Sequence, residues 1–491
     1  MAGSGTTVTY RELNERSIRL ARAWAENGLA PGDHVAILLG NHIRYLEVVW
    51  AALRSGLYYT PVNWHLTAPE VAYIVEDCGA RSVVTELPLA NRLTDLSIEV
   101  PLMMDGTIEG WSAYESALEA QSAAPLADEP EGAGMYYSSG TTGRPKGILF
   151  PLSGRQVREP SPMILPGSPW RFDEETRYLS PAPMYHTAPV VTCSLVHRTG
   201  GTAVLMERFD AERALAAIEN HACNRAQFVP TMFVRMLKLP KEVRDSYDVS
   251  SLEVAAHAAA PCPIEVKRQM IDWWGPVLLE YYAGSENVGS TMIHSEEWLE
   301  HPGSVGLPRF CTVHICDDEH RELPVGEVGQ IWLETPQASF EYHRDPEQTA
   351  ASRSPEGWYT IGDVGYLDGD GYLYLTDRKS FTIISGGVNV YPQEAENVLI
   401  MHPQVADVAV IGVPDNEMGE AVKAVVQPAS GTRGDEALAA ELLQYCRGHL
   451  ASYKCPTSVD FDTALPRQDT GKLYKRLIRD RYWGDSGSRI V

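Results

Sequence analysis

Hydrophobic and polar positions follow two different periods in the first half of the chain. Residues 34–39 (HVAILL) are apolar throughout and come after the turn signal Pro31-Gly32-Asp33, which is typical of a buried strand. Apolar residues then recur at helical spacing from Ile43 to Leu53, and Gly56 ends that pattern. The segment therefore predicts a strand followed by an amphipathic helix.

Helix-like segments lead into strand-like ones at three further places. The pairs are 68–79 with 81–87, 212–222 with 224–233, and 263–275 with 276–284. Repeated units of this kind predict mainly parallel sheets covered by helices, with ligands beyond the carboxyl ends of the strands.

The pattern changes after about residue 302. Short strands and turns follow, as in 326–334 (GEVGQIWLE) and 368–378 (DGDGYLYLTDR). The last hundred residues mix strands with a helix through Leu438 and Leu450. We predict a division into domains 1–377 and 378–491, with the joint near 377–380.

Length and charge narrow the class of protein. The chain has 491 residues, longer than one usual domain, and 44% of them are hydrophobic. The formal net charge of -24 and the lack of Lys/Arg blocks argue against nucleic-acid binding. The N-terminal segment has no leader pattern, no apolar run reaches about 18 residues, and the eight cysteines lack zinc-ligand spacing. A cytoplasmic protein with free thiols is expected.

Residues 136–148 (YYSSGTTGRPKGI) combine glycines, hydroxyl side chains and a lysine. A Walker A loop is excluded, because Arg144 and Pro145 separate Gly143 from Lys146 and Gly147 replaces the Mg²⁺-binding hydroxyl. Backbone N–H groups of such a turn can still close around phosphates. The segment therefore predicts a phosphate loop of another kind.

Four spaced motifs together resemble the adenylate-forming superfamily, which includes acyl-CoA synthetases, adenylation domains and luciferase. They are YYSSGTTGRPKG (136–147), YYAGSE (281–286), the segment from GWYTIGD to PQEAE (357–396) and LPRQDTGKLYKRLIR (465–479). The resemblance covers nearly the whole chain. It implies a large N-terminal α/β domain of helix-covered, mainly parallel sheets with a β-rich subdomain, and a small mobile α+β C-terminal domain.

The same resemblance implies two half-reactions and their residues. A carboxylate attacks the α-phosphate of MgATP to give acyl-AMP and pyrophosphate, and a thiol then displaces AMP. Lys472, Glu286, Ser285 and Thr141 are the expected catalytic residues, with Glu286 also at the Mg²⁺ position. The other nucleotide-binding residues implied are Ser138, Ser139, Gly140, Thr142, Gly143, Lys146, Ala259, Tyr282, Asp363 and Arg378. Lys475 is expected to be a solvated charge.

The substrate side points to a hydrophobic acid. Near Tyr185 and His186 no aspartate stands where amino-acid-activating domains carry one, and the segment around Val229 and Met232 is apolar. These four residues are the predicted acyl pocket, and burial of an acyl tail would drive binding. A fatty, alicyclic or aryl acid is therefore expected.

The Gly386-Gly387 loop resembles the one that lines the CoA tunnel in acyl-CoA synthetases, and Ser380 occupies the hinge position. The expected substrates are the acid, ATP with Mg²⁺, and CoA. Three alternatives stay open: acyl transfer to a carrier protein, luciferase-like oxygenation, and a catalytically silent acyl- or nucleotide-binding protein. A homodimer is also left open.

Overall fold

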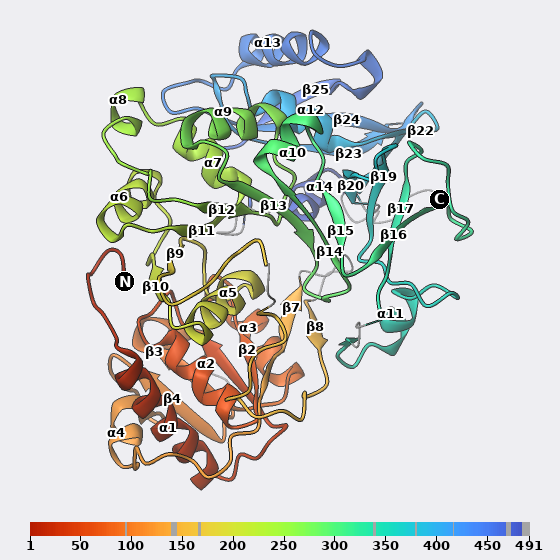
Figure 1. Ribbon diagram of the computed structural model, residues 1–491. Helices are drawn as coiled ribbons and strands as arrows, with labels where there is room; N and C mark the ends of the chain where they lie inside the picture. Colours follow the sequence, from red (N-terminus) through yellow and green to blue (C-terminus); the bar gives the residue numbers. More distant parts are fainter. Residues whose placement is uncertain are drawn as a thin grey trace.

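The computed structural model describes most of the chain, with the side chains of Asp377 and Arg378 excepted. The described ranges are 1–93, 96–138, 145–164, 168–336, 340–378, 381–415, 417–467 and 473–483. Their strands form five sheets, arranged in Figure 1 from the N-terminal layer to a C-terminal lobe at the opposite end. Within these ranges no helix combines the length and the apolar character that crossing a bilayer requires.

The first sheet is parallel throughout and runs in the order β5-β4-β3-β1-β2-β6. Its strands are β1 (His34–Leu38), β2 (Tyr58–Pro61), β3 (Ala80–Glu86), β4 (Val100–Met104), β5 (Ser112–Ala113) and β6 (Ala133–Gly134). The associated helices are α1 (Tyr10–Glu26), α2 (Tyr45–Arg54), α3 (Ala68–Asp77) and α4 (Tyr114–Glu119). The predicted strand-then-helix unit at 34–53 is confirmed.

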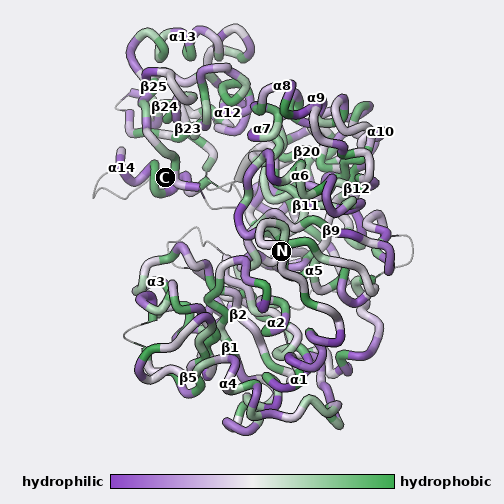
Figure 2. The backbone as a smooth tube through the Cα atoms, turned by 90° about the vertical axis from the view of Figure 1, so that its left-hand side faces the viewer, coloured by the Kyte–Doolittle hydropathy of each residue, from purple (hydrophilic) through white to green (hydrophobic). Residues whose placement is uncertain are grey.

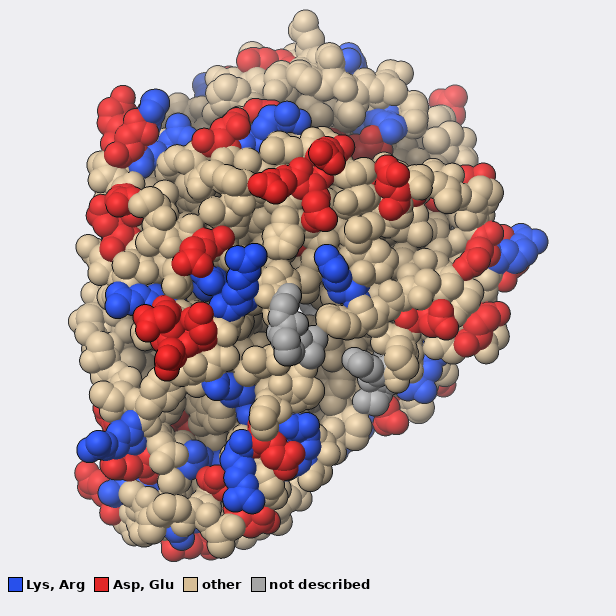
Figure 3. All heavy atoms as spheres, in the orientation of Figure 1, with Lys and Arg blue, Asp and Glu red and all other residues tan. Residues whose placement is uncertain are grey.

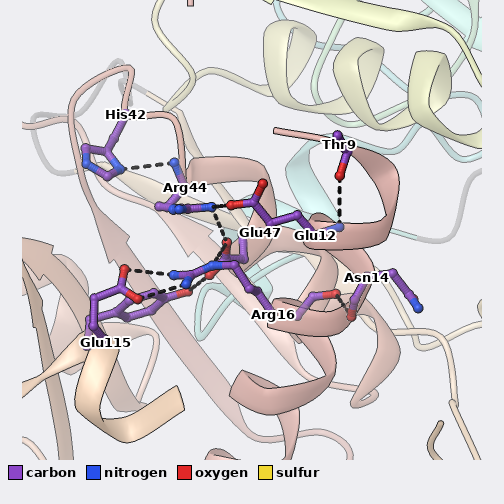
Figure 4. A network of polar contacts seen from close by, with 10 residues as sticks. Thr9, Glu12, Asn14, Arg16, His42, Arg44, Glu47 and Glu115 are labelled. Carbon is purple, nitrogen blue, oxygen red and sulfur yellow. Dashed lines mark hydrogen bonds and ion pairs between the residues drawn. The ribbon is translucent and has the colours of Figure 1, made fainter. Parts of the chain in front are cut away.

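A polar network fastens three of these helices to one another (Figure 4). The Glu47 carboxylate of α2 is 1% exposed and accepts hydrogen bonds from Arg16 Nε of α1 at 2.7 Å and Tyr114 Oη of α4 at 2.6 Å. Arg44 Nη1 lies 3.4 Å from the same carboxylate, and Arg16 also donates to Glu115. The layer thus neutralises its buried charge with its own residues.

The second sheet follows the order β10-β9-β11-β12-β13-β14-β15, parallel as far as β13 and antiparallel beyond it. Its strands are β9 (Arg177–Ser180), β10 (Thr202–Leu205), β11 (Arg225–Phe228), β12 (Val254–His257), β13 (Leu278–Ala283), β14 (Ser290–His294) and β15 (Leu307–Arg309). The helices are α5 (Thr187–Arg198), α6 (Ala211–His221), α7 (Pro230–Leu237), α8 (Lys241–Arg244), α9 (Ile264–Trp274) and α10 (Ser295–Glu300). The prediction that a strand runs through 224–233 is wrong beyond Phe228, because Pro230 begins α7 at a position where a missing N–H costs nothing.

Two smaller sheets make up the predicted β-rich part. One has the order β16-β17-β19-β20, and the other joins β18 to β8 and β7, so that residues near 340 pair with the strand after the predicted phosphate loop. The bounds are β7 (Tyr136–Ser138), β8 (Lys146–Leu149), β16 (Thr312–Cys316), β17 (Gly329–Glu334), β18 (Glu341–Tyr342), β19 (Asp363–Leu367), β20 (Leu373–Arg378) and α11 (Pro346–Ala351).

The C-terminal lobe has a sheet and a hydrophobic core of its own. Strands β22-β21-β24-β23 are antiparallel and β25 adds in parallel to β24, around a core that includes Leu399, Val410 and Leu442. In Figure 2 this lobe lies beside α7 and α8, and Lys238 Nζ donates to the Val405 carbonyl at 2.8 Å. The elements are β21 (Ile383–Ser385), β22 (Val388–Val390), α12 (Pro392–Leu399), β23 (Val405–Asp415), β24 (Gly419–Pro428), α13 (Glu436–Arg447), β25 (Ser458–Phe461) and α14 (Lys475–Trp483).

Candidate active site

A single large cleft collects most of the predicted site residues that the structure describes. Its volume is about 2070 Å³, and it is bounded by the ends of the second sheet, the β7–β8 pair, the β-rich part and the C-terminal lobe. The predicted residues that line it are Ser138, Lys146, Tyr185, His186, Val229, Met232, Ala259, Tyr282, Ser285, Glu286 and Asp363. Predicted residues outside the described ranges are Ser139, Gly140, Thr141, Thr142, Gly143, Ser380 and Lys472, and only the backbone of Arg378 is described.

One end of the cleft brings together residues expected to hold adenine and ribose. Tyr282 lies near the end of β13, and its hydroxyl donates to Asp363 Oδ2 of β19 at 2.9 Å. Both side chains are buried. Ala259, in the neighbouring loop, has φ of +74°, a left-handed backbone that costs an alanine about 1–2 kcal/mol.

A buried ion pair supports this loop and strand from below. Lys267 Nζ of α9 lies 2.6 Å from Glu280 Oε2 of β13, and neither is more than 6% exposed. His257 is 3.8 Å from the same carboxylate. Burial lowers the pKa of His257 well below its usual range, and Lys267 adds to this effect, so the imidazole is neutral. Lys267 and Glu280 are therefore the charged pair that joins α9 to this end of β13.

Glu286 and Ser285 lie in the loop that follows β13. Glu286 Oε1 accepts a hydrogen bond from the Tyr342 hydroxyl at 2.9 Å, and Ser285 Oγ lies 3.0 Å from Thr187 Oγ1 at the start of α5. The neighbouring Asn287 has φ of +51°, a conformation that asparagine tolerates better than most residues. The left-handed backbone therefore accounts for an asparagine at this position.

Lys146 at the start of β8 is held by residues from α11 and the loop before it. Its Nζ donates to Gln348 Oε1 at 2.7 Å and lies 3.6 Å from Asp345 Oδ2. Tyr342 and Gln348 were not predicted from the sequence, because they carry no motif and lie about 200 residues after Lys146. The pairing of β18 with β8 brings them close to Lys146.

Aromatic side chains line the part of the cleft near α5. Tyr185 and His186 have ring centroids 4.3 Å apart, and the rings of His65 and Tyr185 meet edge to face. The rings of Trp64 and His65 are tilted by 30° to one another with centroids 3.5 Å apart. Trp64 and His65 were not predicted, although two aromatic residues shortly after the parallel strand β2 are a signal that could have found them.

Two features of the C-terminal lobe differ in their relation to the cleft. Lys475 lines the cleft but is 8% exposed and lies 2.9 Å from Glu396, so the prediction of a solvated charge is wrong. Gly386 and Gly387 are exposed at the turn between β21 and β22, with φ of +57° and +80°, and are not among the residues that line the cleft. A two-residue hairpin with both φ positive favours glycine by itself.

Comparison with known proteins identifies the family. The model for AMP-binding enzymes matches residues 1–343, and the model for the AMP-binding enzyme C-terminal domain matches residues 394–472. A feruloyl-CoA synthase of Amycolatopsis sp is 36% identical over 97% of this chain and 94% of that protein. A fatty acid–[acyl-carrier-protein] ligase, ScoC of Streptomyces coeruleorubidus, is 32% identical over 99% and 94%.

A solved structure extends the match to three dimensions. The crystal structure of ATP-bound MatB from Rhodopseudomonas palustris superimposes with a TM-score of 0.82 and 28% identity over 99% of this chain and 95% of that one. The expected fold class is confirmed. The chain belongs to the family of AMP-binding enzymes.

Proposed function

We propose that the protein activates a hydrophobic carboxylic acid (fatty, alicyclic or aryl) with ATP and transfers the acyl group to CoA, releasing AMP and pyrophosphate. The observation that carries the proposal is that Tyr282, Asp363 and Glu286 line the same cleft as the apolar Val229 and Met232. Nucleotide and acid can therefore meet in one enclosed space, as acyl transfer through an adenylate requires.

In this proposal the adenine ring stacks on Tyr282 with the Ala259 loop on its other side. Asp363 accepts hydrogen bonds from the ribose, and Arg378 lies near ribose and phosphate. The donors of the phosphate loop, including Lys146 and the backbone at 138–143, hold the β- and γ-phosphates as the leaving group. Ser285 contacts the α-phosphate.

The residues present fit Mg²⁺. Glu286 offers carboxylate oxygens inside the cleft beside the Ser285 hydroxyl, and hard oxygen ligands together with phosphates are what this ion prefers. Glu286 would hold the ion. When bound, Mg²⁺ neutralises phosphate charge.

The chain's own residues would then act in two steps, formation of the adenylate and formation of the thioester. A carboxylate oxygen of the acid bonds to the α-phosphorus while the bond to pyrophosphate breaks, and Lys472 stabilises the developing charge. The CoA sulfur then bonds to the acyl carbon, the thiol proton leaves and AMP departs. We infer a rotation of domain 378–491 on domain 1–377 about Ser380 between the steps, which would bring Gly386 and Gly387 beside the pantetheine arm.

The main alternative keeps adenylation and replaces CoA by the thiol of a carrier protein. The name of ScoC gives a carrier protein as that relative's acyl acceptor, whereas the name of the feruloyl-CoA synthase gives CoA. Localisation in the cytoplasm and a homodimer are further proposals.

Pyrophosphate release from a panel of carboxylates, with and without CoA, tests the function. We expect turnover with hydrophobic acids that rises on addition of CoA, and amino acids and acetate as poor substrates. Lys472→Ala should lose acyl-AMP formation by about 10²-fold or more, yet still convert supplied acyl-AMP and CoA to thioester. An exposed neighbour, Arg476→Ala, is the control. Absence of pyrophosphate release with every acid would favour a silent binding protein, and equal loss of both half-reactions in Lys472→Ala would remove its assigned role.

A further inference from the structure

A polar cluster lies on the side of the second sheet that faces α5. Gln227 Nε2 of β11 donates to the Tyr281 hydroxyl of β13 at 2.5 Å. Gln227 Oε1 accepts hydrogen bonds from Tyr178 Oη of β9 and Thr192 Oγ1 of α5, each at 3.2 Å. All four residues line the cleft, and none of them belongs to the site predicted from the sequence.

The cluster contains two donor hydrogens for which the described residues provide no acceptor. Both lone-pair positions of Gln227 Oε1 are used, whereas its second amide hydrogen and the hydroxyl hydrogen of Tyr281 have no acceptor among the described residues. Burial raises the pKa of Tyr281 to about 12, so the hydroxyl keeps its proton. Ser180, two residues after Tyr178 on the same face of β9, is 1% exposed, and its Oγ lies beside the Tyr178 hydroxyl and Cys193 Sγ.

The walls around the cluster are aromatic and apolar. Trp170 contacts the Tyr281 ring edge to face at a centroid distance of 6.0 Å, and Met292 packs in the same group of side chains. Both residues line the cleft. A flat ring with one polar substituent matches this lining better than a polar chain or a wholly saturated one, because apolar walls favour the ring and buried donors require an oxygen.

Helix α5 sets the distance from the reacting end to the cluster. Its first residue, Thr187, lies beside Ser285 at 3.0 Å, and Thr192 comes five residues later. At a rise of about 1.5 Å per residue, the separation along the helix axis is roughly 7.5 Å. A ring carried on a short side chain spans this length between its carboxylate and an oxygen on its far edge.

We propose that the acid is an aryl acid whose ring carries a hydrogen-bond-accepting oxygen, hydroxyl or methoxyl, at the end remote from the carboxylate. Gln227 and Tyr281 donate to that oxygen, while Tyr178 and Thr192 fix the orientation of the Gln227 amide. The inference rests on the proposed function and deepens it. An analogue without the oxygen would leave buried donors unpaired, which is the condition under which binding sites discriminate strongly.

The test compares two acids of similar size, 3-(4-methoxyphenyl)propanoate and 3-(4-ethylphenyl)propanoate. We expect kcat/KM for pyrophosphate release to favour the methoxy acid by about 30-fold or more. Gln227→Leu and Tyr281→Phe should each reduce the ratio to below about fivefold, chiefly by loss with the methoxy acid. Thr85→Val is the matched control, because it removes a buried hydroxyl, bonded to the Leu38 carbonyl at 3.0 Å, that is not among the cleft-lining residues.

A ratio near one in the unaltered enzyme, or a ratio unchanged in both variants, would overturn the proposal. Calorimetric binding of the two acids in the presence of a non-hydrolysable ATP analogue separates it from the proposed function. If no acid releases pyrophosphate but the methoxy acid binds more tightly, and Gln227→Leu abolishes that preference, the adenylation proposal fails and the polar cluster keeps its role. Equal binding of both acids would refute the role independently of any activity.

Discussion

Two buried carboxylates, Glu47 in the N-terminal helical layer and Glu286 in the cleft, have opposite surroundings. Glu47 is 1% exposed and is contacted by Arg16, Arg44 and Tyr114. Glu286 is 8% exposed, and its one side-chain partner among the described residues is Tyr342. The first charge is neutralised by Arg16 of α1 and by Arg44, the residue before α2, whereas the second lines a space of about 2070 Å³.

Burying a charge costs free energy in both places, so the difference lies in what offsets the cost. At Glu47 the offset comes from the fold, and the network stabilises the helical layer. At Glu286 it would come from a ligand that arrives with positive charge. Acidic and basic groups are intermixed over the face that Figure 3 shows. A charged ligand would therefore be recognised by residues inside the cleft.

The largest expected effect is that of Glu286→Gln on chemistry. The substitution keeps the shape and the bond from Tyr342 but removes the charge, so acyl-AMP formation should fall by about 10²–10³-fold. The melting temperature of the variant should stay within about 1 °C of the parent's, a shift that corresponds to about 1 kcal/mol for a chain of this length. A variant that keeps activity, or that loses it only by unfolding, would contradict the assigned ligand role.

Glu47→Ala should lower the stability of the fold and leave the chemistry unchanged. It leaves the Tyr114 hydroxyl buried without an acceptor and two arginines without a shared carboxylate, so the free energy of unfolding should fall by about 3 kcal/mol in urea denaturation. The kcat of the folded fraction should not change. Glu12→Ala is the control: it removes another partner of Arg44, but one 40% exposed, and should cost no more than about 1 kcal/mol. If the free energy of unfolding falls by a similar amount in both variants, the burial of Glu47 is not the cause of the destabilisation.

Lys475→Met tests a pair that stabilises the lobe at the edge of the cleft. Glu396 would lose its partner at 2.9 Å while still accepting from the Val410 N–H at 2.7 Å, so the free energy of unfolding should fall by about 2 kcal/mol. The double variant Glu396→Leu/Lys475→Met should recover at least half of that loss, because it removes the buried carboxylate together with the lysine. If the double variant is less stable than the single one, the pair is not what holds α14.

Local patterns in the sequence predicted the elements that local physics decides. Apolar periodicity predicted β1, α2, α6 and α9. The phosphate loop stays a prediction, made because glycines, hydroxyls and Lys146 stand together in the sequence. Gly386 and Gly387 show the limit of such reasoning, since the positive φ of a hairpin turn favours both glycines by itself and their place beside CoA stays a prediction.

What the sequence could not predict depends on distant contacts. Tyr342 reaches Glu286 through the β18–β8 pairing, and the Gln227 cluster needs three strands and a helix brought together. The burial of Lys475 follows from the packing of α14 on β23 and from the ion pair with Glu396 of α12, which no pattern around LYKR indicates. These residues carry no motif because their chemistry arises only from the tertiary fold.

The smallest expected effect compares two alanines with left-handed backbone, Ala259 beside the proposed adenine position and Ala222 at the end of α6. Glycine relieves a strain of about 1–2 kcal/mol but loses about 0.5–1 kcal/mol of unfolded-state entropy, so each substitution should raise the free energy of unfolding by about 0.5–1 kcal/mol. Only Ala259→Gly also removes a methyl group from the cleft and loosens the loop over the nucleotide, so it alone should raise KM for ATP, by about two- to fivefold, a cost of up to about 1 kcal/mol. Urea denaturation and ATP titration of both variants measure the two quantities. A raised KM in Ala222→Gly, or an unchanged one in Ala259→Gly, would show that the strained loop beside Tyr282 serves the fold in the same way as the end of α6 and has no part in binding the nucleotide.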